Sequence, residues 1–109
     1  MLTSIFSYNH DISTGDFTSD SIQSNGLPVA VQLLITNLGG TLTSSYINIE
    51  GSIDGTNYYN LKSTVLTAAD AAKNPIYVIP DTPGLLFIRV KFVKGGAATG
   101  TITKVLFIH

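Results

Sequence analysis

The feature that most restricts the fold of this chain is a repeated alternation of apolar and polar residues in short runs. Clusters of Gly, Asn, Asp and Pro separate the runs. A period of two places successive side chains on opposite faces of a strand, and the separating residues favour turns. The pattern therefore predicts an all-β protein, an antiparallel sandwich or barrel of about eight strands that forms a single domain over residues 1–109.

The expected strands differ in how clearly their two faces can be told apart. The clearest is 29–36, and in 46–53 we expect Ile47, Ile49 and Ile53 to face inward, with Gly51 at a bulge. Residues 1–16 could form either a first strand or an extended arm. In chain order the expected strands are 2–8, 17–23, 29–36, 46–53, 58–61, 76–79, 85–94 and 101–108.

Two connections carry their own predictions. The run 95–100, Gly-Gly-Ala-Ala-Thr-Gly, suggests a long hairpin between the last two strands. The run 67–73 begins with a cap-like Thr67 three residues before Asp70, which predicts one turn of helix that ends at Asn74-Pro75.

The last two strands are apolar on both faces. Leu85 and Phe87 lie opposite a face formed by Leu86, Ile88, Val90 and Phe92. Val105 and Phe107 lie opposite Ile102, Leu106 and Ile108. Two explanations stay open, burial beneath a loop or an interface between subunits. The interface interpretation makes Leu85, Phe87, Val105 and Phe107 the candidate contact residues.

The overall composition excludes several classes of function. Six basic and seven acidic residues give a net charge of −1, so no basic surface for nucleic acid or anionic lipid is expected. The absence of cysteine excludes disulfides, cysteine-based zinc sites and thiol nucleophiles. Charged residues make up only 12% of the chain and hydrophobic residues 44%. Such a composition favours assembly over an isolated, highly charged monomer.

No catalytic, metal-binding or cofactor-binding motif is found. His10 and His109 lack a partner at the spacing of a nucleophile or a metal ligand. Asp11, Asp16 and Asp20 do not follow the spacing of a calcium loop, so we interpret them as turn and cap residues. Neither Gly39-Gly40 nor Gly95-Gly96 precedes a helix that could hold a phosphate. The sequence therefore predicts a protein that is not an enzyme and needs no cofactor.

One hairpin motif stands out, Ile-Glu-Gly-Ser-Ile-Asp-Gly-Thr-Asn-Tyr-Tyr-Asn-Leu at 49–61. Asp54-Gly55 supplies a tight turn, and the following aromatic residues can cover it. The motif resembles a hairpin that recurs in small β-sandwich structural proteins of tailed bacteriophages and, in looser form, in discoidin-like carbohydrate-binding sandwiches. The turn residues Asp54, Asn57, Tyr58 and Tyr59 are the candidate contact loop.

The phage resemblance implies a jelly-roll-like sandwich that forms homo-oligomers, with a trimer favoured. We expect a structural protein of the virion, made in the host cytoplasm, that decorates and stabilises the head by binding itself and the major capsid or other virion proteins. The alternative is a carbohydrate- or receptor-binding module. Its stacking faces would come from Tyr8, Tyr46, Tyr58 and Tyr59, and its hydrogen bonds from Asn48, Asn57 and Asn60.

Overall fold

The computed structural model describes residues 2–25, 28–40, 45–67, 74–80 and 85–109, except for the side chains of Asn25 and Leu85. The chain is all-β, with one short 3-10 turn among the described residues. The elements are β1 (Thr3–Asp11), η1 (Ile12–Thr14), β2 (Phe17–Thr18), β3 (Ile22–Asn25), β4 (Val29–Gly39), β5 (Tyr46–Ser52), β6 (Tyr59–Val65), β7 (Ile76–Ile79), β8 (Leu85–Val93) and β9 (Thr99–Ile108).

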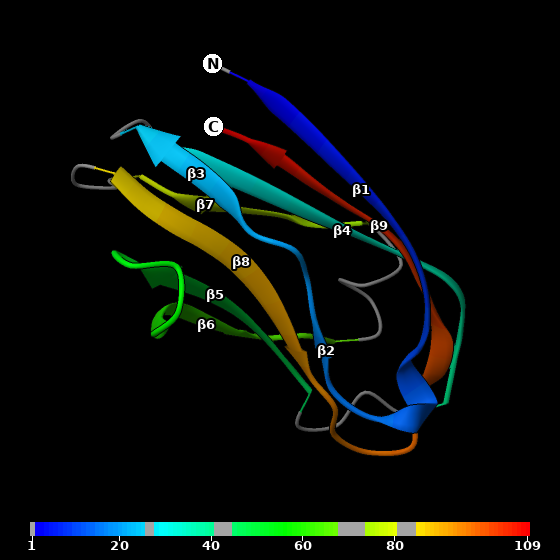
Figure 1. Cartoon of the computed structure of the whole chain (residues 1–109). Helices are drawn as coiled ribbons and strands as arrows, with labels where there is room; N and C mark the ends of the chain where they lie inside the picture. Colours follow the sequence, from blue (N-terminus) through cyan, green and yellow to red (C-terminus); the bar gives the residue numbers. More distant parts are fainter. Residues whose placement is uncertain (1, 26–27, 41–44, 68–73, 81–84) are drawn as a thin grey trace.

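The strands form two antiparallel sheets, drawn in Figure 1 as two layers. The four-stranded sheet has the order β1-β9-β4-β7, and the five-stranded sheet has the order β2-β8-β5-β6, with β3 also paired to β8. Consecutive strands often lie in different sheets. The first and last strands, β1 and β9, are direct neighbours, so the two chain ends lie side by side in Figure 1.

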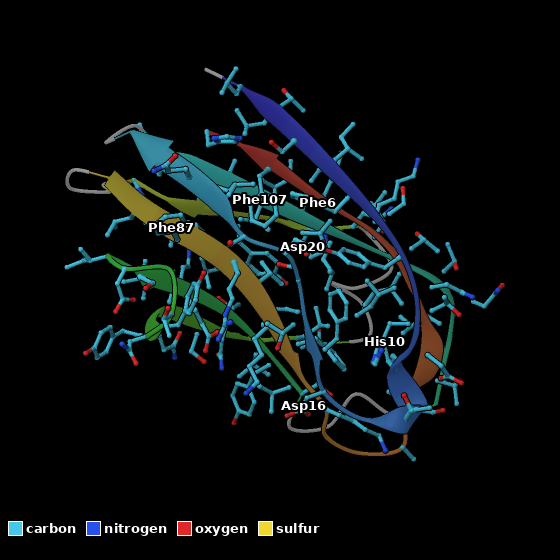
Figure 2. The ribbon with its side chains drawn as sticks, in the orientation of Figure 1. Phe6, His10, Asp16, Asp20, Phe87 and Phe107 are labelled. Carbon is cyan, nitrogen blue, oxygen red and sulfur yellow. The ribbon has the colours of Figure 1, made fainter. Side chains whose placement is uncertain are left out.

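The buried side chains of both sheets form one hydrophobic cluster, which explains why the alternating runs fold as they do. The expected inward face of β4 is confirmed, because Val29, Val31, Leu33 and Ile35 are all buried. So is the expected inward face of β8, formed by Ile88, Val90 and Phe92. Phe6 of β1 meets Phe107 of β9 edge to face at 5.9 Å, and Figure 2 shows the two side by side.

A β-bulge in β9 explains why apolar residues occur on both faces of the alternation expected for that strand. Lys104 pairs with Leu34 but Ile102 pairs with Ile35, so Thr103 is an extra residue on β9. Beyond this extra residue, the side chains of β9 that strict alternation would place outside point into the core instead. Ile102 and Val105 therefore both point into the core despite their odd spacing, and Phe107 follows Val105.

The hairpin expected between the last two strands is wrong. The strand β8 lies in the five-stranded sheet and β9 in the other, so residues 94–98 cross between sheets. The crossing is fixed by the Ser45 hydroxyl, which donates to the Gly95 carbonyl and accepts from the Gly95 N–H. Alternation identifies strands and their faces but carries no information about which strands pair. Here β8 pairs with β5, and β9 pairs with β4.

Three further expectations concern the chain outside the core strands. Of residues 1–16, expected as a first strand or an extended arm, Thr3–Asp11 form strand β1. The expected strand 17–23 is divided into β2 and β3, because the Ser19 backbone N–H and side chain both bond to Val90 at the break. The expected helical turn at 67–73 lies outside the described residues except for Thr67.

Candidate functional site

The turn that joins β5 to β6 is held by one carboxylate. Asp54 Oδ1 accepts hydrogen bonds from the Ser52 hydroxyl and from the backbone N–H groups of Thr56 and Asn57, each at 2.8 Å. Its Oδ2 accepts from the Asn57 side-chain amide at 2.8 Å. The donors, the Asn57 N–H foremost, hold the pKa of the Asp54 carboxyl well below its usual range. Asp54 is therefore an ionised acceptor that organises the turn.

Arginine 89 of β8 lies beside this turn. It forms an ion pair with Glu50 at 2.8 Å, and its guanidinium lies 3.7 Å from the centre of the Tyr58 ring. The register of the sheet places Glu50 directly opposite Arg89. Tyr58 is thus held against the outer surface of the five-stranded sheet by a cation–π contact.

The turn covers part of the apolar face that the sequence left unexplained. A side chain added at Gly55 would contact the Phe87 ring at 3.5 Å, so the turn lies against Phe87. Gly55 itself has a φ of +78°, the left-handed conformation that an Asp-Gly turn requires. For Phe87, burial beneath a loop is therefore the explanation that the structure supports.

An open depression of about 260 Å³ adjoins the turn and is lined by Ile53, Asp54, Asn57 and Tyr59. Ile53 was expected to face inward, but it lies beyond the end of β5 and is 82% exposed. Tyr59, at the start of β6, is 73% exposed. Of the predicted contact residues, Asp54, Asn57 and Tyr59 meet at this depression, while Tyr58 contacts Arg89 instead.

Two of the predicted interface residues are in the core. The side chains of Val105 and Phe107 are completely buried within this single chain, so they cannot form a contact surface between subunits. The bulge at Thr103 turns them inward. Phe87 is partly covered by the turn. Figure 2 shows it on β8, away from Phe6 and Phe107. The side chain of Leu85 lies outside the described residues.

An exposed apolar surface does exist, but on the other side of the molecule. It is the face of the four-stranded sheet that points away from the core, and two rows of paired residues cross it. One row is Ile5, Leu106, Gln32 and Ile76. The other row is Thr3, Ile108, Ala30 and Val78. Neither row contains a charged residue.

We call this surface the outer apolar face and define it by Ile5, Ala30, Ile76, Val78, Leu106 and Ile108. Ile76 is 62% exposed and Ile5 is 57% exposed, although isoleucine is among the residues most often buried. The sequence contained two signals for this surface. The first strand has apolar residues on both of its faces, and the run 76–79 is apolar without interruption. Neither signal could be used without knowing which strands are neighbours.

The three aspartates of the first twenty positions each accept at least one hydrogen bond. Asp11 caps η1 and accepts hydrogen bonds from the Ser13 N–H and hydroxyl, which lower its pKa. Asp16 accepts from the Lys94 N–H. Asp20 accepts from the Tyr8 hydroxyl. The interpretation as a turn and cap residue is confirmed for Asp11, whereas Asp16 and Asp20 bond to residues farther away in the chain. No group of three potential metal ligands occurs within the described ranges.

Histidine 109 joins the two sheets. Its Nδ1 lies 2.9 Å from the Gln23 carbonyl oxygen, and its Nε2 lies 2.9 Å from the Ser4 hydroxyl. A carbonyl only accepts, so Nδ1 carries a proton and donates it to Gln23. The contact links β1, the end of β9 and β3, and we interpret it as structural. The sequence separation of 105 positions between Ser4 and His109 hides it from any motif search.

Comparisons with known proteins add little to these observations. No family model and no curated protein matches the sequence. Among solved structures, the chain is similar to the crystal structure of PirA, with a TM-score of 0.47 and 15% identity over 98% of this chain and 93% of that chain. In the described residues, no helix has the length and apolar character needed to cross a membrane.

Proposed function

We propose that the protein is a non-enzymatic structural subunit of a bacteriophage particle, a decoration protein that associates with copies of itself and stabilises the head. The observation that carries the proposal is the outer apolar face. Proteins rarely leave several neighbouring aliphatic side chains exposed on one sheet face, here Ile5, Ile76, Val78 and Ile108, unless another surface packs on them. Copies of the same face that meet around a threefold axis are suitable partners, since neither row requires an opposite charge.

The dimensions of the four-stranded sheet are compatible with this role. Three strands of about ten residues and the four-residue β7, spaced about 4.8 Å apart at about 3.3 Å per residue, present roughly 540 Å² in projection. A standard protein interface buries about 800 Å² on each partner. The sheet face can therefore supply most of the area of such a contact, and a trimer is the assembly that we favour.

We further propose that the two sheets form a jelly-roll sandwich. The order β1-β9-β4-β7 and the order β2-β8-β5-β6, with β2 and β3 counted as one strand, support this topology. Jelly rolls are frequent among viral shell proteins and lectins. The hairpin motif at 49–61 supports the same class, and the major capsid protein or another virion protein would be the second partner.

The first test is the oligomeric state. At micromolar concentration, light scattering coupled to size exclusion should give a mass of three chains, and Ile76→Lys should give the mass of one chain. Val65→Lys, at an exposed position on the edge strand β6, is the matched control and should leave the assembly intact. A monomeric wild-type protein would contradict self-association.

The second test is binding to phage particles. Heads that lack the protein should bind it during co-sedimentation and become more resistant to heat or chelators, and Ile76→Lys should weaken this binding because avidity is lost. If the wild-type chain neither sediments with such heads nor self-associates, the proposed function is wrong.

A further inference from the structure

We infer that the depression beside the β5–β6 turn is a binding site for a neutral saccharide, formed by Tyr59, Ile53, Asn57 and Asp54. This function goes beyond the proposed role in assembly. The site lies on the hairpin of the five-stranded sheet, whereas the outer apolar face belongs to the four-stranded sheet. The two surfaces can therefore be tested separately.

The site is held in shape before any ligand arrives. Four hydrogen bonds to Asp54 fix residues 52–57, and the Ser52 hydroxyl also accepts from the Gly55 N–H at 2.9 Å. On the sheet side, the turn lies against the Phe87 ring. A loop that is already ordered loses little conformational entropy on binding, which favours recognition of a small ligand.

The start of β6 provides an aromatic face for the ligand. Tyr59 pairs with Gly51 of β5, and Leu61 covers Gly51, since an added Cβ there would lie 2.7 Å from Leu61 Cδ1. Leu61 therefore occupies the space above Gly51, and the Tyr59 ring is left 73% exposed. Ile53 adds an exposed aliphatic side chain across the depression. An exposed ring beside an aliphatic group suits the C–H face of a sugar.

The polar rim consists of acceptors and an amide. Each carboxylate oxygen offers about two acceptor positions. Asp54 Oδ1 already accepts three hydrogen bonds, but Oδ2 accepts only one. Oδ2 can therefore accept one more hydrogen bond. Asn57 donates one amide proton to Asp54 and keeps a second donor and a carbonyl oxygen. Adjacent hydroxyl groups of a sugar both donate and accept, and they match this rim.

Charge and size favour a neutral sugar over other small ligands. An anion would meet the ionised Asp54, while Arg89 nearby is already paired with Glu50 and Tyr58. A cation would find one free acceptor position on Asp54 and no second carboxylate in the lining of the depression. The volume of about 260 Å³ is below the range of roughly 300 to 1,000 Å³ that is typical for drug-sized ligands, so one or two sugar rings fit better than a long chain.

The test is a titration followed by NMR of the labelled full chain with glucose, galactose, mannose, N-acetylglucosamine, N-acetylgalactosamine, lactose and chitobiose. We expect saturable shifts of residues 53–59 with at least one sugar, at millimolar affinity. Tyr59→Ala should weaken this binding by about tenfold or more, because the stacking face is lost. Tyr46→Ala is the matched control, since Tyr46 is also exposed but lies at the far end of β5, and it should leave the affinity unchanged.

Ile53→Ser is a second variant that should also weaken sugar binding. Ile53→Ser and Tyr59→Ala both lie at exposed positions and should not disturb folding. The titration is repeated with Ile76→Lys, and equal affinity there shows that sugar binding does not depend on assembly. The inference is overturned if no sugar gives saturable shifts at tens of millimolar, if Tyr59→Ala binds as well as wild type, or if choline binds more tightly than every sugar.

Discussion

Single polar residues perform much of the structural work in a chain with few charges. Asp54 organises a six-residue turn, Ser45 fixes the crossing between the sheets, and Ser19 replaces a backbone partner at the break between β2 and β3. Short side chains suit these positions because they reach backbone groups of neighbouring residues with little loss of entropy. Every buried side-chain N or O atom within the described residues has a hydrogen-bond partner.

The role of Asp54 predicts a pH-dependent effect of its replacement. Its pKa is lower in the folded chain than the value of about 3.9 expected in the unfolded chain. The stabilisation is therefore complete above about pH 4 and is lost as pH falls through the folded pKa. Asp54→Asn should lower Tm at pH 7, and the difference from wild type should shrink towards pH 2. Thermal unfolding by circular dichroism measures it, and a difference that stays constant with pH would contradict this role.

At the scale of elements, bulges decide which side chains are buried. The bulge at Thr103 lets β9 bury Ile102, Val105 and Phe107, and it leaves Leu106 and Ile108 on the outer apolar face. A second irregularity, between Ile49 and Glu50 of β5, inserts Leu61 on the facing strand β6. A sequence read with strict alternation assigns all residues beyond a bulge to the wrong face.

Because the bulge places Phe107 in the core and Ile108 on the outer apolar face, replacing these two adjacent residues should have different effects on stability and on self-association. Phe107→Ala should cost about 3 to 5 kcal/mol of the free energy of unfolding, because it opens a cavity in the core. Ile108→Ala should cost less than about 1 kcal/mol in the monomer but should weaken self-association. Urea denaturation gives the first quantity and light scattering the second.

Phe107→Leu supplies a measurable core variant if Phe107→Ala does not fold. Its cost should be up to about 1.5 kcal/mol. Equal losses of stability at positions 107 and 108 would show that the bulge does not set the phase of β9 as described.

At the scale of the whole molecule, hydrogen bonds link the two sheets along their edges, outside the hydrophobic core. Along the β1 margin, His109 bonds to Gln23, and the Tyr8 hydroxyl donates to Asp20 Oδ2 and accepts from the Asp20 N–H. Tyr8 also meets Phe17 edge to face at 4.8 Å. Along the opposite margin, Lys62 of β6 donates to the Val78 carbonyl of β7. Figure 2 shows Asp20 on the segment that faces β1.

The Tyr8 contact predicts a loss of stability in alkali. Burial of the ring, with a further contribution from the Asp20 carboxylate, raises the pKa of Tyr8 to about 12, above its ordinary value of 10.0. Its stabilisation is therefore complete below pH 10 and is lost as pH rises from 10 to 12. Tyr8→Phe should cost about 1 kcal/mol at pH 7, and this cost should diminish at pH 11.

Urea denaturation at the two pH values measures the effect, and Tyr59→Phe, at an exposed ring, is the control that should change neither value. If Tyr8→Phe unfolds at the same urea concentration as wild type at pH 7, the contact between β1 and Asp20 does not stabilise the molecule.

Local sequence by itself determined the class of the fold, most of the strands and the turn at Asp54-Gly55, because alternation and turn chemistry act between residues close in the chain. It also identified Asp54, Asn57 and Tyr59 as neighbours, since one hairpin carries them. The tertiary structure alone decided which strands pair, which face of β9 is buried and where the exposed apolar surface lies. These depend on contacts between distant residues, such as Ile5 with Leu106 and Gln32 with Ile76, and on a one-residue bulge that reverses the facing of a strand.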